Sequence, residues 1–254
     1  MSFIIILLFI LLYQTGIIQS IELSTIGLIN RSLILGLLLF ATSIIGILIL
    51  YGKMNLEDLG LKGKDLPLAI VIGIVIWISV QIIEGIIGYV RFGMLVIDPL
   101  WNTESSVLIG LLIAMVFGIA LFEETGFRGF LLIQFNIMFE KPIRSKSLRI
   151  ILALFFSQIF FTLIHLPWKV YIQGWTESVF FDLIFSVFLN GIIFGLFYLR
   201  TRNLFFVMFV HALGNAPTSL FQTSIQPSIL ILILAILIVV IWPIFVKKNA
   251  EINI

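Results

Sequence analysis

Long apolar runs with few or no charged side chains constrain the fold of this chain more than any other feature. A run of about 20 apolar residues is long enough for a helix that crosses the hydrocarbon core of a bilayer. The runs cover residues 3–21, 32–52, 66–83, 105–139, 150–166, 179–199 and 203–246. Pro167 is expected to end the fifth run, and polar and proline residues near 214–227 are expected to divide the last run into a short helix and a further span. The pattern predicts an all-α, polytopic membrane protein with about eight transmembrane helices.

The composition agrees with a membrane protein. Hydrophobic residues make up 61% of the 254 residues and charged residues 11%, far outside the range of soluble domains. Eight spans with short loops use the whole chain, so we expect a single transmembrane domain over residues 1–254 in the lipid bilayer. The absence of cysteine excludes disulfides and thiolate nucleophiles or ligands. No basic cluster with interleaved aromatic residues indicates nucleic acid as a partner.

The distribution of Lys and Arg predicts the orientation of the chain. With eight helices, one side of the membrane receives Lys53, Lys62, Lys64, Lys141, Arg144, Lys146, Arg149, Arg200, Arg202, Lys247 and Lys248. The other side receives only Arg31, Arg91 and Lys169. Because basic residues are enriched in cytoplasmic loops, both termini are predicted to be cytoplasmic.

Ionisable side chains within the apolar runs mark candidate functional positions, because placing such a group at the centre of a membrane helix costs about 2.5–3.5 kcal/mol on insertion scales. These side chains are Glu84, Glu123, Glu124, Arg128, His165, Asp182 and His211. Glu124 and Arg128 share one face of a helix and are expected to neutralise each other, whereas Glu123 points away from them and lacks a partner on its own helix. Glu84 belongs to no motif, and Asp182 is expected to face interfacial water.

The two histidines lie on different runs from these carboxylates. Counted from the basic loop between the fourth and fifth runs, Glu123 and His165 are both about 24 Å deep along a helix. His211 is only about 14 Å along a straight helix from Arg202, so it reaches the same level only if its helix is tilted, broken or begins deeper. His211 and Asn215 share one helical face and can offer an imidazole and an amide to one substrate oxygen.

These residues support two chemistries that their spacing does not separate. In the first, Glu123 is the general base for a water that His165 orients or exchanges a proton with, while His211 and the Asn215 amide stabilise a developing oxyanion. In the second, Glu123, His165 and His211 are candidate ligands of a divalent metal such as zinc, which keeps a water position open. Either chemistry predicts hydrolysis of an amide or ester bond inside the membrane.

Three short motifs occur in a defined order on these helices. The stretch EETGFR at 123–128 matches an EExxxR pattern, FTLIH at 161–165 an FxxxH pattern, and HALGN at 211–215 an HxxxN pattern. Together they resemble the CPBP family of intramembrane proteases, also called the Abi or CAAX protease-like family, over a core of about residues 105–220. The family includes the endopeptidase that trims prenylated CAAX proteins and bacterial bacteriocin-processing or immunity proteins.

The resemblance implies a role for each matched residue. Glu123 is implied to activate water with His165 as its partner, and His211 and Asn215 to form the oxyanion-side or metal-side pair. Glu124 and Arg128 are implied to be a structural or positioning pair. The family is described both as metalloproteases and as glutamate-dependent proteases, so the resemblance does not decide the cofactor.

The resulting hypothesis is an intramembrane endopeptidase that cleaves a membrane-associated protein or peptide. Two other classes of protein would also carry carboxylates and histidines in membrane spans. One is a non-catalytic immunity or regulatory partner, in which Glu123 would be dispensable. The other is a proton-coupled transporter, which predicts a continuous polar pathway and often inverted repeats.

Overall fold

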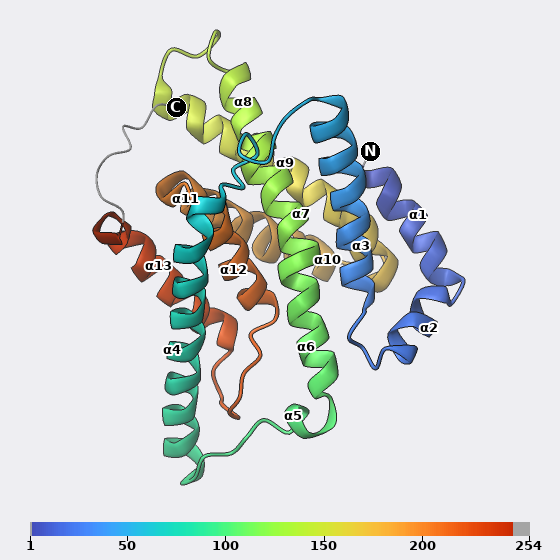
Figure 1. Cartoon of the computed structure of the whole chain (residues 1–254), viewed down its shortest axis with the longest axis vertical. Coiled ribbons are helices and arrows are strands. Elements are labelled where there is room, and N and C mark those ends of the chain that lie inside the picture. The colour runs from blue at the N-terminus through green and yellow to red at the C-terminus, as the bar shows by residue number, and fades with distance from the viewer. Residues whose placement is uncertain (1, 246–254) are drawn as a thin grey trace.

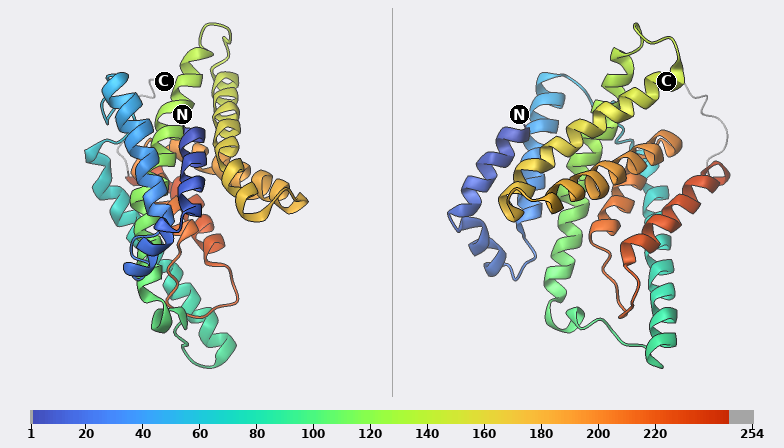
Figure 2. Two further views of the ribbon diagram at one scale, coloured as in Figure 1. Left: turned by 90° about the vertical axis from the view of Figure 1, so that its right-hand side faces the viewer. Right: turned by 180° about the vertical axis from the view of Figure 1, so that it is seen from behind.

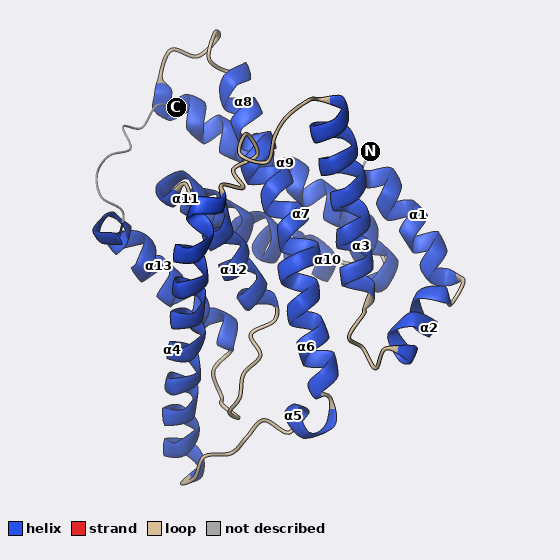
Figure 3. Cartoon of the chain, viewed as in Figure 1, coloured by secondary structure: helices blue, strands red, loops and turns tan. Residues whose placement is uncertain are grey.

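The computed structural model describes residues 2–245, and in this range the chain is helical throughout (Figures 1 and 3). The elements are α1 (Ser2–Gln14), α2 (Ile17–Ser24), α3 (Arg31–Leu39), η1 (Phe40–Tyr51), η2 (Gly63–Asp65), α4 (Leu66–Phe92), α5 (Leu100–Thr103), α6 (Ser105–Ala114), η3 (Met115–Ala120), α7 (Leu121–Glu123), η4 (Glu124–Leu131), α8 (Leu132–Met138), α9 (Lys146–Gln173), α10 (Glu177–Asp182), η5 (Leu183–Leu189), α11 (Asn190–Thr201), α12 (Leu204–Asn215) and α13 (Pro227–Phe245). The η segments are π-helical, except for η2, which is a 3-10 turn. The only extended pairing among the described residues is an isolated bridge between Ile97 and Phe221. The predicted all-α fold class is confirmed.

Six helical segments are long and apolar enough to cross a membrane. They are Arg31–Tyr51, Gly63–Phe92, Ser105–Met138, Lys146–Gln173, Glu177–Thr201 and Pro227–Phe245. The bent pair of α1 and α2 makes a seventh if it is counted as one span, whereas α12 has only 12 residues. The chain is therefore a multi-pass integral membrane protein, but the predicted number of eight spans is not confirmed.

The first predicted span is broken near its middle. α1 and α2 are bent by 73° at the short break between Gln14 and Ile17. Gly16 has a φ of +81°, a conformation that residues with a side chain rarely adopt, and it turns the chain. The prediction of one continuous helix was wrong because the sequence is apolar on both sides of the glycine and hydrophobicity alone does not reveal the turn.

Pro167 does not end its helix, as the sequence predicted. α9 continues through the proline to Gln173. Proline removes one backbone hydrogen bond, and helices in membrane proteins tolerate this loss where neighbouring helices and side chains satisfy the freed backbone groups. The continuation carries Trp168 and Lys169 alongside the cavity described below.

Glycines bring α3 and the α6–α8 segment into backbone contact. A Cβ atom on Gly36 would lie 2.3 Å from the backbone of Gly118, and one on Gly110 would lie 2.1 Å from the carbonyl oxygen of Gly27. Later residues of one segment meet later residues of the other, so the two segments run parallel. Small residues allow membrane helices to approach this closely.

The short helix α12 begins inside the bundle. Leu204 is fully buried, and Asn203 before it is 3% exposed. The Asn203 side chain accepts a hydrogen bond from the Phe206 amide (3.0 Å) and donates to the carbonyl of Asp65 (2.9 Å). This buried start of α12 makes a depth counted along a straight helix from Arg202 inapplicable.

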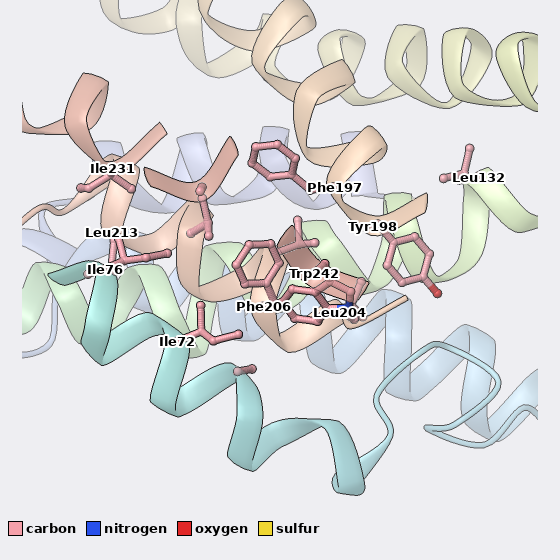
Figure 4. Close-up of a cluster of buried hydrophobic side chains, with 14 of the residues drawn as sticks. Ile72, Ile76, Leu132, Phe197, Tyr198, Leu204, Phe206, Leu213, Ile231 and Trp242 are labelled. Atoms are coloured by element: carbon pink, nitrogen blue, oxygen red, sulfur yellow. The ribbon is translucent and has the colours of Figure 1, made fainter. Parts of the chain in front are cut away.

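A hydrophobic core surrounds α12. Figure 4 shows Leu204, Phe206 and Leu213 of α12 close to Ile72 and Ile76 of α4, and these residues belong to one buried cluster. Trp242 of α13 packs on Phe206 with ring centroids 4.9 Å apart. The core therefore fixes the helix that carries the third motif.

The long helices follow two directions. Figure 1 shows α3, α4 and the α6–α8 segment along the long axis of the molecule, and Figure 2 shows α9 and the α10–α11 segment crossing obliquely behind them. The η1–η2 and α8–α9 loops lie at one end of the molecule, and α5 lies at the other. Lys247 and Lys248 lie outside the described residues, and the cytoplasmic location of both termini stays a prediction.

Candidate active site

The three motifs lie on different parts of the fold. The first is at the junction of α7 and η4, the second on α9 and the third on α12. The helix around the first motif is π-helical both before and after the three-residue α7. Such π-helical turns occur frequently at functional sites. Glu123 and Glu124 are both buried here, and they contact different partners.

Glu123 lies between the two imidazole rings. Its Oε1 is 3.3 Å from Nε2 of His165, and its Oε2 is 3.6 Å from Nε2 of His211. The carboxylate without a partner on its own helix is thus held between side chains of α9 and α12. The His165 side chain is 24% exposed and that of His211 is 6% exposed, so the side chain of His165 is the more accessible of the two.

His165 is oriented by the backbone of its own helix. Its Nδ1 lies 2.8 Å from the carbonyl oxygen of Phe161, and the Phe161 and His165 rings are 4.6 Å apart. A carbonyl oxygen only accepts hydrogen bonds, so Nδ1 carries the proton. In the neutral ring, Nε2 then presents its lone pair to Glu123.

His211 is oriented by the second carboxylate. Its Nδ1 lies 2.7 Å from Oε1 of Glu124, whose Oε2 is 3.2 Å from Nε of Arg128. Arg128 also donates to the carbonyl of Gly191 (3.0 Å), and its guanidinium carbon lies 4.5 Å from the centre of the Phe161 ring. Glu124 and Arg128, which are 0% and 2% exposed, therefore form a buried chain that ends on His211.

The two Nδ1 contacts have a common consequence for Glu123. Because each ring donates from Nδ1 to a fixed acceptor, each neutral ring directs the lone pair of Nε2 toward the same carboxylate. Two nitrogen lone pairs and a carboxylate repel one another unless a proton, a hydrogen-bonded water or a cation lies among them. The geometry thus concentrates proton-accepting atoms around one small volume.

The same atoms are the candidate metal ligands. Glu123, His165 and His211 supply oxygen and nitrogen donors of the kind that zinc binds. Among the described residues, however, no group of three or more His, Asp or Glu side chains has an arrangement suited to a metal ion. The chemistry derived below therefore involves no metal.

These residues line a cavity of about 820 Å³. Its walls come from α1, α3, η3, α9, η5, α11, α12 and α13. Asn215 lines the cavity one helical turn beyond His211 and is exposed. Pockets of this size accommodate drug-sized ligands or several residues of a peptide. The structure thus places Glu123, His165, His211 and Asn215 on one cavity, with Glu124 and Arg128 buried behind it.

Some supporting residues were not identified from the sequence. The Phe194 ring stacks on His211 with centroids 4.9 Å apart. A Cβ on Gly191 would lie 2.0 Å from the side chain of Gln158, so glycine at this position leaves room for that side chain. An aromatic residue or glycine in an apolar helix carries no specific signal, which explains why the sequence did not reveal them.

The helix α4 holds the loop that follows α12. The Gln81 side chain accepts a hydrogen bond from the Leu220 amide (2.7 Å), and Glu84 accepts one from the Ser219 hydroxyl (3.0 Å). Trp77 donates from its indole nitrogen to the Thr218 hydroxyl (3.0 Å). Glu84, which no motif included, thus contacts the loop after Asn215 and makes no printed contact with Glu123.

The family comparison covers all three motif segments. Residues 103–217 match the family model described as type II CAAX prenyl endopeptidase Rce1-like. The predicted resemblance is confirmed. The Rce1-like segment is a little less than half of the chain, and it extends from the residues before α6 to those just after α12. At the family level, it supports a CAAX-type intramembrane protease. No curated protein and no solved structure matches the chain.

Proposed function

We propose that this protein is an endopeptidase that hydrolyses a peptide bond inside the membrane with water activated by Glu123 and His165. The observation that carries the proposal is the position of Glu123 between the Nε2 atoms of two oriented histidines on the wall of a cavity. The Rce1-like match supports the same reaction class. Neither the transporter nor the non-catalytic partner gains support from that match.

The proposed reaction begins with a water between Glu123 and His165. Glu123 accepts a proton from this water as the oxygen attacks the carbonyl carbon of the scissile bond. The carbonyl oxygen becomes an oxyanion in the tetrahedral intermediate, and the Asn215 amide donates a hydrogen bond to it. A protonated His211 donates a second through Nε2. As the C–N bond breaks, Glu123 returns its proton to the leaving amine, and its carboxylate is restored.

The buried pair behind the site has a supporting role in this proposal. Glu124 holds His211 in one orientation, and Arg128 keeps Glu124 ionised and fixed. Preorganised groups of this kind stabilise developing charge without rearranging during the reaction. Arg128 and Glu124 are thus proposed to position His211 and not to contact substrate.

The proposed substrate is a membrane-associated peptide or protein. Apolar side chains such as Phe9, Leu35 and Ile229 line the cavity together with the polar site residues. An extended segment of a chain anchored in the bilayer can therefore bring a peptide bond to Glu123 while its apolar side chains remain out of water. Processing of prenylated CAAX proteins and of bacteriocin leaders are both compatible with this substrate class.

A cleavage assay tests the proposal. The purified protein in lipid is incubated with a panel of tagged membrane peptides, and wild type is compared with Glu123→Gln and His165→Ala. We expect specific cleavage by wild type and its loss in both variants, with unchanged thermal unfolding of Glu123→Gln as the check on folding. Equal cleavage by all three proteins would reject the proposed site. A cellular phenotype that survives Glu123→Gln, without cleavage by any of them, would support the non-catalytic partner.

A further inference from the structure

Two basic side chains, Arg31 and Lys169, line the same cavity as Glu123. Lys169 is neutralised by an ion pair with Asp182, whose side chain is 27% exposed. Asp182, which the sequence placed in interfacial water, is therefore the partner of a cavity lysine. The charge on Arg31 has no comparable neutralisation.

The guanidinium of Arg31 has one hydrogen-bond partner in the described part of the chain. It donates from Nη1 to the Tyr13 hydroxyl (2.8 Å) and lies 5.7 Å from the centre of that ring. The Glu22 carboxylate accepts from the backbone amide of Arg31 (2.7 Å), and it does not form an ion pair with the side chain. Since a guanidinium has five N–H donors, most of them are available to a ligand in the cavity.

The contact between α3 and η3 gives the separation of Arg31 from Glu123. Gly36 meets Gly118 where the two parallel segments touch. Arg31 lies five residues before Gly36, and Glu123 lies five residues after Gly118. With a rise of 1.5 Å per residue, Arg31 and Glu123 are about 15 Å apart along the helices.

An extended peptide covers this separation in a few residues. At about 3.4 Å per residue, 15 Å corresponds to roughly four residues, and the length of the arginine side chain reduces this to three or four. A peptide bond at Glu123 would thus place a group three or four residues away beside Arg31.

We propose that Arg31 binds a carboxylate of the substrate three to four residues from the scissile bond. This inference rests on the proposed protease function and adds a determinant of specificity to it. Guanidinium and carboxylate form charge-assisted hydrogen bonds, which are stronger than neutral ones. The carboxylate belongs either to the C-terminus of a short leaving fragment or to an Asp or Glu side chain at that distance.

The experiment uses pairs of peptides that differ only in charge. One pair ends in a free acid or an amide three or four residues after the scissile bond, and a second pair carries Asp or Asn, with an amidated end, at the same distance on either side. We expect wild type to prefer the carboxylate member of one pair by roughly five- to tenfold in kcat/KM, mainly through KM. The pair that shows the preference identifies the source of the carboxylate.

Variants then assign the preference to Arg31. Arg31→Gln is expected to remove it while still cleaving the amide peptide, and Arg31→Lys is expected to retain part of it. Arg91→Gln is the matched control, because Arg91 is an exposed arginine at the far end of α4 that does not line the cavity. This control should keep the full preference.

Three outcomes would overturn the inference. Wild type could cleave the members of each pair equally, Arg31→Gln could keep the wild-type preference, or Arg31→Gln could lose cleavage of acid and amide peptides equally while Arg31→Lys restores both equally. The last result would assign Arg31 to the tether with Tyr13 or to a lipid headgroup. Cleavage of no peptide by wild type would instead count against the protease function itself.

Discussion

Oε1 of Glu124 lies 2.7 Å from Nδ1 of His211, although 87 residues separate them in the chain. This contact joins the first motif to the third and leaves Nε2 of His211 facing Glu123. The two consecutive carboxylates thus have different surroundings. Glu124 is fixed by Arg128 and His211, and Glu123 faces the cavity.

Replacement of Glu123 by glutamine separates chemistry from folding. Glutamine keeps the shape of the side chain but cannot accept a proton from water, so we expect kcat to fall by about 10²–10⁴-fold. Glu104→Gln is the control, because Glu104 is an exposed carboxylate in the same Rce1-like segment and lies outside the cavity. Cleavage kinetics and thermal unfolding in lipid test this prediction, and a Glu123→Gln variant with wild-type kcat would contradict it.

Replacement of Glu124 by alanine is expected to affect both stability and activity. It leaves Arg128 buried without its partner, which costs about 3–5 kcal/mol of unfolding free energy. It also frees His211, and misplacement of a catalytic group by about 1 Å can reduce the rate by about 10²-fold.

The Glu140–Arg149 ion pair provides the control for Glu124→Ala. The Glu140 side chain is 66% exposed, so Glu140→Ala should cost no more than about 1 kcal/mol and leave cleavage unchanged. Denaturant unfolding and kcat/KM measured on the same preparations compare the two variants. Similar stability losses in both would show that the buried pair is not special.

Removal of metal ions tests the donor arrangement. No group of three or more His, Asp or Glu side chains in the described chain suits a metal ion, so we expect cleavage to survive a strong chelator. The measurement is the cleavage rate before and after chelation, together with the metal content of the protein. Activity that disappears on chelation and returns with zinc would assign Glu123, His165 and His211 as metal ligands.

The contact between Gly36 and Gly118 is expected to be sensitive to a single methyl group. In Gly36→Ala, the Cβ atom would lie 2.3 Å from the Gly118 backbone, which forces the helices apart at a cost of about 1–3 kcal/mol. In Gly126→Ala, the nearest listed atom of another helix is the Ile44 Cδ1 at 3.7 Å, an ordinary contact. Thermal unfolding should therefore distinguish two identical substitutions, and equal melting temperatures would contradict this packing.

Part of this architecture follows directly from the sequence. Apolar runs predict membrane helices because hydrocarbon admits few other structures, and a carboxylate among them indicates a site because burying it is costly. The break at Gly16 and the continuation through Pro167 were not predictable in this way. Both depend on whether neighbouring helices satisfy or constrain the local backbone.

The position of His211 shows where counting along helices fails. A depth estimate assumes that a helix begins at the membrane surface, but α12 begins at a buried Asn203 that is hydrogen-bonded to the carbonyl of Asp65. Likewise, the i, i+4 spacing indicates that Glu124 can pair with Arg128, but it contains no information about His211. Contacts between distant segments depend on the tertiary fold.

The helix α4 carries no motif residue and lies outside the Rce1-like segment, yet it and the residue preceding it contact both ends of α12. Asp65 holds Asn203 before the helix, and Gln81 holds Leu220 after it. A fragment limited to residues 103–217 would contain every proposed catalytic side chain but lack this scaffold. The smallest catalytic unit is therefore larger than the segment by which the family is recognised.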